Sequence, residues 1–196
     1  MLIVIHFSFS PPGIEFLLSY IYKCERPKGN TLSLYLLVLF VIIDNMLKLI
    51  EKELQLETLE HLYSNVEDLR LAWTKAMLPF NREQWIEWFK ESKERKAYSL
   101  YLEKDGATIG HSAVLKYKSG PELSYMCFLI IDQELRGKGY GKELTRLTCD
   151  FVRQNIPSKE VYLMVSPENI PAYSCYLNSG FHYVDGTDPK RFKKLL

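Results

Sequence analysis

The chain has 196 residues and a mass of 23.0 kDa, which is the size of one domain or of one domain with an appendage. Apolar residues make up 47% of it and charged residues 25%, and this balance excludes a disordered or fibrous chain. Lys and Arg number 25 and Asp and Glu number 24, so the net charge of +1 gives no global attraction to nucleic acid or to an anionic membrane. We therefore expect no nucleic-acid partner.

Residues 1–45 differ from the rest because they carry only six charged side chains, and residues 32–43 are apolar at every position except Ser33. This run is shorter than the roughly 20 residues that cross a bilayer. A signal peptide fits poorly, because Lys23 and Arg26 lie well inside the chain. The segment could contact a membrane, form an extra buried element, or be an extension. We favour an extension at 1–45 before a domain at 46–196.

From residue 46 onward the sequence has the pattern of a complete α/β domain. Residues 47–56 alternate as a strand does. Apolar residues then recur every three or four positions over 59–76, which predicts an amphipathic helix that ends before Pro79. A second helix begins after Asn81, because a glutamine follows three residues later as in a capping box.

Strand signals dominate the next part of the chain. Residues 97–103 and 108–118 alternate on either side of Asp105-Gly106, so they predict a hairpin. Residues 123–131 are almost all apolar, as expected for a buried central strand. The remaining expected elements are a helix after residue 141, a buried strand at 161–165, a helix at 172–179 and strands at 181–184 and 191–195. The strand–helix–strand order implies a parallel crossover, and the hairpin makes the sheet mixed.

Cysteines and histidines are scattered without the spacing of a metal site or a disulfide framework. We expect no metal cofactor, and free thiols are typical of a reducing, cytoplasmic environment. Each histidine is expected to pack in the core or to face solvent. The residues concerned are Cys24, Cys127, Cys149, Cys175, His6, His61, His111 and His182.

The most informative segment is the sequence Arg-Gly-Lys-Gly-Tyr-Gly at 136–141, which follows the buried strand and opens a helix. Glycines let a ligand approach the backbone amides, and a helix N-terminus adds unpaired N–H groups and partial positive charge. Arg136, Lys138 and Lys142 add full charges, so the segment predicts a pyrophosphate site. A P-loop is excluded because Glu143 follows Lys142, and the glycine spacing does not fit a dinucleotide fingerprint.

At this segment the sequence resembles the GCN5-related N-acetyltransferase (GNAT) superfamily. Arg136, Gly139 and Gly141 match its (R/Q)xxGx(G/A) signature. Residues 169–181 match a second pattern of the family, N-x-x-A-x-x-(apolar)-Y-x-x-x-G-F. The resemblance leaves out residues 1–45. It implies an α/β fold with a mixed, mostly antiparallel sheet that splays at a parallel β-α-β unit and carries helices on both faces.

The resemblance implies an enzyme that transfers an acetyl group from acetyl-CoA to a primary amine of a small molecule or peptide. By the same resemblance, the strand end pairs with the pantetheine arm, and an amide there steadies the developing oxyanion. Asn169 contacts the cofactor beyond the next strand. The implied cofactor residues are Leu129, Ile130, Ile131, Arg136, Gly137, Lys138, Gly139, Tyr140, Gly141, Lys142 and Asn169.

The reaction moves two protons: the attacking amine loses one and the departing CoA thiolate gains one. Side chains or water must carry both. Tyr176 matches the family tyrosine that serves as general acid, because a phenol can protonate a thiolate of comparable basicity, and Tyr173 is the fallback. Histone-type members of the family carry a glutamate on the central strand as general base. The corresponding position here falls near Tyr125, so this base cannot be carried over. The base stays open between Glu122, the nearest carboxylate, and a route through water.

Other candidate bases are weaker. We expect Asp132 and Glu134 to be loop residues, and His111 on the hairpin is only a remote candidate.

The acceptor side of the family is built by the first two helices, where Trp73, Trp85, Trp88 and Phe80 lie. These side chains either pack the helices or form an aromatic wall for an apolar or cationic acceptor. No acidic cluster stands out for a polycationic substrate. A non-catalytic acyl-CoA-binding module is the alternative function. A homodimer stays open, and membrane contact is open only through residues 1–45.

Overall fold

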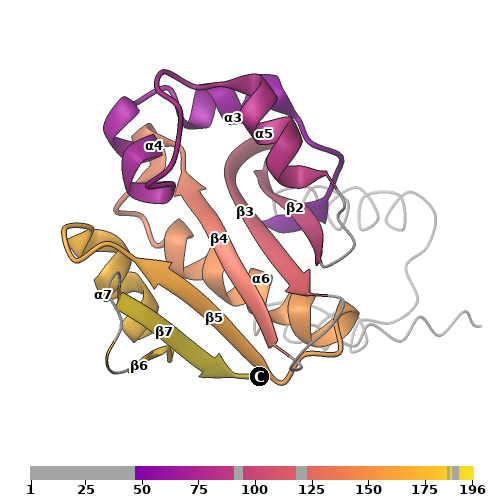
Figure 1. The fold of residues 1–196 in the computed structure, drawn as a ribbon, viewed down its shortest axis with the longest axis vertical. Coiled ribbons are helices and arrows are strands. Elements are labelled where there is room, and N and C mark those ends of the chain that lie inside the picture. Colours follow the sequence, from indigo (N-terminus) through magenta and orange to yellow (C-terminus); the bar gives the residue numbers. More distant parts are fainter. Residues whose placement is uncertain (1–46, 91–94, 118–122, 185, 187–189) are drawn as a thin grey trace, which may run out of the picture. The chain divides into compact units, whose positions relative to one another are not determined.

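The structure is a computed structural model that describes residues 47–90, 95–117, 123–184, 186 and 190–196. The expectations for residues 1–45 and for Glu122 lie outside these residues. The elements in chain order are β1 (Lys48–Glu51), α3 (Leu56–Leu62), α4 (Val66–Ala72), α5 (Arg82–Phe89), β2 (Arg95–Lys104), β3 (Ala107–Tyr117), β4 (Leu123–Ile131), η1 (Gln133–Leu135), α6 (Tyr140–Asn155), β5 (Glu160–Val165), α7 (Ile170–Asn178), β6 (His182–Val184) and β7 (Lys190–Leu195) (Figure 1).

The strands form one seven-stranded sheet in the order β1-β2-β3-β4-β5-β7-β6. Among the described strands, only the β4–β5 pair is parallel, and α6 connects these two strands. The β2–β3 hairpin turns at Asp105 and Gly106, whose φ angles are 52° and 78°. The predicted mixed, mostly antiparallel sheet is therefore confirmed.

Strands β4 and β5 pair only at their beginnings. Residues 123–125 of β4 are in register with residues 160–162 of β5, and no pairing follows. The two strands then diverge toward their carboxyl ends, as Figure 1 shows. The sheet therefore splays at its parallel pair, which leaves backbone groups on the facing edges of both strands without a neighbouring strand.

Helices cover both faces of the sheet. On one face, α6 and α7 pack on a core that includes Leu100, Met126 and Val152. On the other face, α3, α4 and α5 pack on a second core around Leu59 and Trp85. Because both faces are covered, β4 is apolar along most of its length, and the expectation of a buried central strand is confirmed.

The helix expected over 59–76 is interrupted. The side chain of Asn65 accepts hydrogen bonds from the amides of Glu67 and Asp68, so it ends the first helix region and caps α4. Asparagine competes with the helical backbone in this way, which favours caps over helix interiors. The apolar period stays in phase across the break, because Leu62 and Leu69 are both buried. The periodicity alone therefore did not reveal the break.

The N-cap predicted for the next helix is confirmed, because Asn81 Oδ1 accepts a hydrogen bond of 2.8 Å from the amide of Gln84. The side chain of Gln84 does not return to Asn81. It bonds instead to the backbone of Lys75 and Met77, and so fastens the segment between α4 and α5. None of the helices within the described ranges has both the length and the apolar character needed to cross a bilayer.

Candidate active site

A large pocket lies where β4 and β5 separate. Its volume is about 1400 Å³, and its lining comes from β4, the glycine segment, the loop after β5, the first turns of α7 and the end of α4. Segments far apart in the sequence therefore meet in one cavity. The pocket includes the sequence-predicted residues Leu129, Ile130, Ile131, Arg136, Gly137, Gly139, Gly141, Lys142, Asn169 and Tyr176.

The glycine segment has a backbone that other residues adopt only with strain. Gly137 has a φ of 76° and Gly139 has a φ of 87°, and Gly139 is the N-cap of α6. A Cβ at Gly141 would lie 3.7 Å from Cys175 Sγ, so α6 and α7 approach each other closely here. The N-terminus of the 16-residue α6 therefore borders the pocket with its unpaired amides and partial positive charge.

Arg136 binds its own chain rather than pointing freely into the pocket. Its Nε donates to the carbonyl of Ile131 at 2.9 Å, and its two terminal nitrogens donate to the two carboxylate oxygens of Asp68, each at 2.9 Å. The side chain thus ties the end of β4 to α4. Its guanidinium holds the loop in shape. The amides of Arg136 and Lys142 donate to the carbonyls of Gln133 and Gly139, while the amides between these two residues stay available to a ligand.

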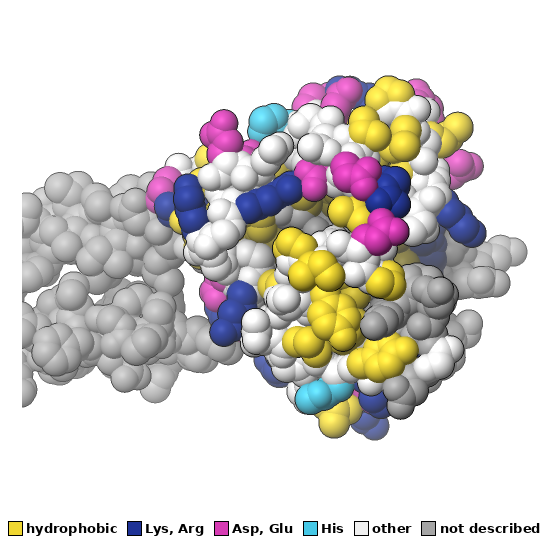
Figure 2. Space-filling model, turned by 90° about the vertical axis from the view of Figure 1, so that its left-hand side faces the viewer, with side chains coloured by type: hydrophobic (Ala, Val, Ile, Leu, Met, Phe, Trp, Pro, Cys, Tyr) yellow, Lys and Arg dark blue, Asp and Glu magenta, His cyan; other side chains and the backbone are white. Residues whose placement is uncertain are grey.

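A second ion pair fastens α4 on the other side of the pocket. Arg70 Nη2 lies 2.7 Å from Glu168 Oε2, in the loop after β5, and Arg70 also binds Glu67. Figure 2 shows acidic and basic side chains side by side above a group of hydrophobic ones on this face. Because Asp68 and Arg70 lie on one helix, α4 is linked to both loops that flank the glycine end of the pocket.

Two of the predicted residues lie outside the pocket lining. Lys138 Nζ donates to the carbonyl of Glu134 at 3.2 Å. The ring of Tyr140 lies 5.5 Å from Lys104 Nζ, on the side of the β2–β3 turn. Both residues belong to the glycine segment, but neither side chain is directed into the pocket.

A bulge interrupts β4 beside the pocket. His111 is in register with Ile130 and Ala113 with Cys127, so Phe128 and Leu129 together face a single residue of β3. Phe128 has a φ of 55°, which is unusual for a residue other than glycine. The bulge turns a peptide unit out of the regular ladder. Nothing in the apolar run 123–131 predicts it.

The carbonyl of the bulged peptide has a defined partner. The hydroxyl of Tyr63 donates to the carbonyl oxygen of Phe128 at 2.8 Å, and Tyr63 is only 1% exposed. Since the C=O and N–H of a peptide point in opposite directions, the amide of Leu129 points away from Tyr63. Sequence reasoning missed Tyr63, which falls at the unpredicted break between α3 and α4.

Tyr176 lies on α7 and lines the pocket. Asn169 caps this helix by accepting a hydrogen bond of 3.2 Å from the amide of Ala172, which fixes where the helix begins. Burial raises the pKa of Tyr176 well above its usual range, and the neighbouring thiols of Cys175 and Cys127 raise it further. Its hydroxyl forms no hydrogen bond with the described part of the chain. The phenol therefore stays protonated and is available to a ligand.

Tyr173, the alternative general acid, lies outside the pocket. Its ring packs edge-on against Phe192, with centroids 5.2 Å apart, and it does not line the pocket. The structure therefore places Tyr176 in the pocket and Tyr173 outside it, a difference that the sequence alone does not show.

The candidate bases are distributed over different places. Tyr125 lies in the pocket, and its hydroxyl is 3.5 Å from Nη1 of Arg191. His111 is fully buried beside Ser99, and burial lowers its pKa to about 3. Asp132 caps η1 and contacts His61, as expected of a loop residue.

Within the described ranges, the carboxylates that line the pocket are Asp68 and Glu168, and both form ion pairs with arginines. Neither is therefore poised as a free base.

Two cysteines also line the pocket, and Cys127 is not an activated nucleophile. Cys127 Sγ donates to the carbonyl of Ala113 at 3.6 Å, and burial raises the pKa of this thiol far above its usual value. Cys175 Sγ lies 3.9 Å from Thr145 Oγ1. Among the described residues there is no group of three His, Cys, Asp or Glu side chains arranged to hold a metal ion.

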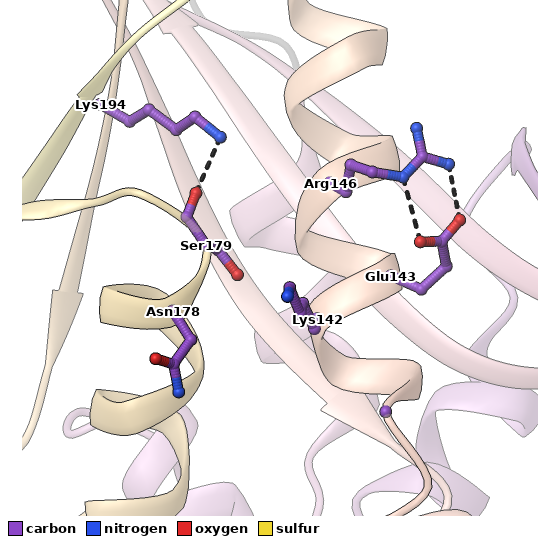
Figure 3. Close-up of a pocket in the computed structure, with 7 residues that line it drawn as sticks. Lys142, Glu143, Arg146, Asn178, Ser179 and Lys194 are labelled. Atoms are coloured by element: carbon purple, nitrogen blue, oxygen red, sulfur yellow. Dashed lines mark hydrogen bonds and ion pairs between the residues drawn. The ribbon is translucent and has the colours of Figure 1, made fainter.

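A smaller cleft of about 410 Å³ continues from the glycine segment between α6 and the end of α7 (Figure 3). It shares Gly139, Lys142 and Asn178 with the large pocket. Arg146 is bound to Glu143 on its own helix, and Lys194 Nζ donates to the carbonyl of Ser179 at 2.8 Å. The cleft therefore has three cationic side chains and one carboxylate, which favours an anionic ligand.

The aromatic residues near the first helices divide into two groups. Trp85 is 1% exposed and packs against Phe80, with ring centroids 5.5 Å apart. Trp73 and Trp88 are half-buried, and both line the pocket. Trp85 and Phe80 therefore pack the helices. Trp73 and Trp88 border the pocket, and their role as a wall for the acceptor stays a prediction.

The comparisons with known proteins agree with this geometry. Residues 60–181 match the sequence profile of the acetyltransferase (GNAT) family. The chain therefore belongs to this family of acyltransferases, and the predicted family and enzyme class are confirmed. A search of curated protein sequences gives no match.

Solved structures show the same fold at low sequence identity. Spermidine N-acetyltransferase from Vibrio cholerae, solved with CoA and spermine, is 20% identical with a TM-score of 0.62 over 76% of this chain and 95% of that one. A domain from Methanocaldococcus jannaschii is 19% identical with a TM-score of 0.60 over 77% and 100%. The aminoglycoside acetyltransferase AAC(6')-Ib with coenzyme A is 17% identical with a TM-score of 0.60 over 76% and 95%, and it has also been solved with kanamycin.

Proposed function

We propose that the protein transfers the acetyl group of acetyl-CoA directly to a primary amine of a small molecule or peptide, with Tyr176 as general acid. The observation that supports this most is that one pocket joins the glycine-segment amides, the β4 bulge and the phenol of Tyr176. In the reaction, the amine nitrogen bonds to the carbonyl carbon and the carbon–sulfur bond breaks. The leaving thiolate takes a proton from Tyr176, and the amine loses one.

The glycine end of the pocket suits the pyrophosphate of CoA. The positive φ angles of Gly137 and Gly139 keep side chains away from the amides, and Lys142 adds a charge that no described carboxylate neutralises. The unpaired edge of residues 129–131 can accept an extended pantetheine arm as a further strand would pair. Asn169 uses its side-chain oxygen as a helix cap, so its amide nitrogen is left for the cofactor.

The bulge in β4 offers a backbone amide for the carbonyl oxygen of the thioester. The hydrogen bond from Tyr63 holds the Phe128 carbonyl and thereby fixes the opposite direction of the Leu129 amide. An N–H group fixed beforehand stabilises a developing oxyanion without reorganising during the reaction. We therefore assign this role to the amide of Leu129.

The raised pKa of Tyr176 is compatible with proton donation, because the burial that disfavours its phenolate also disfavours the CoA thiolate in the same pocket. Direct attack is favoured over an acyl-cysteine, because burial keeps Cys127 protonated. Since both described pocket carboxylates are ion-paired, the amine loses its proton to water unless Glu122 supplies a base.

The test measures thiol release from acetyl-CoA with a panel of amines. Tyr176→Phe should lower kcat by about 10²- to 10⁴-fold, the usual contribution of a general acid, while calorimetry shows unchanged acetyl-CoA binding. Tyr173→Phe is the matched control, since this tyrosine lies on the same helix outside the pocket. Equal losses of binding and rate, or no loss of either, contradict the acid role. Thermal stabilisation by CoA without thiol release from any amine would indicate a binding module instead.

A further inference from the structure

We propose that Asp68 is a positioning residue for the cofactor, and that through Arg136 it holds the glycine segment in the shape that binds the pyrophosphate of CoA. The inference rests on the acetyl-CoA site proposed above. It adds to that site a residue of α4, a helix that lies outside both sequence patterns of the family.

The carboxylate of Asp68 has a fixed place on α4. The backbone amide of Asp68 donates to Asn65 Oδ1 at 3.3 Å, so the cap sets where the first turn of the helix begins. The next residue, Leu69, is 1% exposed and packs in the core beneath the helix. Since α4 lies at the carboxyl end of β4 (Figure 1), Asp68 meets the chain where it leaves this strand.

Arg136 joins Asp68 to the end of β4 through three hydrogen bonds. Its Nη1 and Nη2 donate to the two carboxylate oxygens, and its Nε donates to the carbonyl of Ile131, each at 2.9 Å. Two parallel bonds to a carboxylate fix the orientation of the guanidinium plane as well as its distance. Because Arg136 is the first residue of the glycine segment, the pair with Asp68 fixes where this segment begins.

The two ends of the glycine segment are held in different ways. At the far end, the amide of Lys142 donates to the carbonyl of Gly139 at 3.1 Å, which belongs to the first turn of α6. At the near end, Arg136 is tied to a separate helix. Gly137 and Gly139 lie between, and glycines leave the backbone more freedom than other residues do. A loop that is ordered before binding loses less affinity to the cost of ordering when CoA arrives.

The charge of Asp68 favours this role over a direct contact with the cofactor. Asp68 lines the pocket, and an unpaired carboxylate there would repel a pyrophosphate. The bidentate pair with Arg136 offsets this charge, so Asp68 can order the loop without opposing the ligand. A role in moving a proton would instead require the carboxylate to leave Arg136.

The neighbouring residue Glu67 offers a matched control. It also lies in the first turn of α4 and also binds an arginine, but this arginine is Arg70 of the same helix. The pair of Glu67 therefore does not reach the glycine segment. Its removal takes the same charge from the same helix turn, so effects on the helix alone appear in both variants.

The test measures acetyl-CoA binding to the full chain by calorimetry, and thiol release with an amine that the unchanged chain uses. Asp68→Ala should weaken acetyl-CoA binding by about tenfold, because the loop then becomes ordered only on binding. Its kcat at saturating substrates should stay within about twofold of the unchanged chain, since the lost interaction acts on binding. Glu67→Ala should leave acetyl-CoA affinity unchanged.

A double-mutant cycle tests whether Asp68 acts through Arg136. The double variant with both residues changed to Ala should bind acetyl-CoA as weakly as Arg136→Ala alone, because the pair can be broken only once. If Asp68→Ala does not fold, Asp68→Asn takes its place. Asn keeps the shape of the side chain but has one acceptor oxygen, so it should weaken binding by about threefold or more.

Contrary results separate this inference from the proposed function. A loss of kcat with unchanged acetyl-CoA affinity overturns the inference, because Asp68 then acts on the reacting groups. Unchanged affinity in the folded Asp68 variant, an equal loss in Glu67→Ala, or losses that multiply in the cycle also overturn it. Each of these leaves the proposed function intact. The proposed function itself is overturned if the unchanged chain releases no thiol with any amine.

Discussion

The two ends of the pocket differ in whether backbone or side chains line them. The glycine end is made mainly of backbone, with amides exposed by Gly137 and Gly139 and oriented by α6. The other end, beside the bulge, is where we expect the acceptor amine to bind, and we call it the acceptor end. It is lined by side chains, chiefly Trp73 and Trp88, which come from separate elements. A backbone site binds a group that every CoA-dependent reaction shares, whereas a side-chain site determines what is selected. The predictions below concern in turn the core behind the acceptor end, the bulge between the two ends, and the glycine end.

The largest expected effect concerns the core behind the acceptor end. His111 is buried and its folded pKa is lowered to about 3, so the unfolded chain binds its proton at a higher pH than the folded chain does. Stability should therefore be lost as the pH falls below the unfolded value near 6.5, by about 1 kcal/mol per unit or slightly more, and by about 2.5 kcal/mol between pH 6 and pH 4.

Urea unfolding at several pH values measures this loss. His111→Asn lacks the titrating ring and should have a flatter stability curve over this range, even if it is less stable at pH 7. Parallel curves for the two proteins contradict the assignment, because other groups then cause the acid loss.

The second prediction concerns the bulge between the two ends. Tyr63→Phe removes the hydrogen bond to the Phe128 carbonyl and frees the Leu129 amide to turn. We expect kcat to fall by about tenfold, less than the loss of an oxyanion donor itself, while KM for acetyl-CoA is unchanged. Stability should fall by about 1 kcal/mol.

Tyr101→Phe is the matched control, because Tyr101 is also buried and its hydroxyl also binds a backbone group, the amide of Gln55, at 2.8 Å. It should cost similar stability without changing kcat. If both variants lower kcat alike, the effect of Tyr63 is general destabilisation and not positioning.

The third prediction tests whether the backbone at the glycine end is specifically shaped for binding. Gly139→Ala places a Cβ at a φ of 87°, where strain of about 1–2 kcal/mol favours another loop conformation. Calorimetry should show acetyl-CoA affinity reduced by about tenfold.

Gly106→Ala provides the comparison, since Gly106 has a φ of 78° in the β2–β3 turn, and a Cβ would meet no atom within 4 Å at either glycine. It should lower stability and leave acetyl-CoA affinity unchanged. Equal affinities for all three proteins would mean that the loop shape does not matter for binding.

This contrast between backbone and side chains also explains what the sequence could predict. The glycine segment, the Asn81 cap and the order of strands and helices along the chain were visible because they depend on local residue types and spacing. The bulge was invisible because Phe128 lies within a uniform apolar run, and its φ depends on Tyr63 from another element. The division of the aromatic residues into core and wall was also hidden, because it depends on which ring faces the sheet.

The smallest expected effect lies at the outer edge of the glycine end, where Lys142 connects the large pocket with the smaller cleft. CoA carries a 3′-phosphate that dephospho-CoA lacks, and we expect the cations of this cleft to bind it. Because the lysine is exposed, Lys142→Met should weaken CoA binding by only about fivefold or less. The loss should be smaller for dephospho-CoA.

Lys138→Met changes a lysine of the same segment that lines neither cavity and should leave both affinities unchanged. Calorimetry at two salt concentrations adds a second criterion, because a contact between exposed charges weakens as salt increases. If Lys142→Met weakens CoA and dephospho-CoA by the same factor, the lysine binds the pyrophosphate alone. The smaller cleft then has no part in holding the cofactor, and the glycine end is confined to the backbone groups of the large pocket.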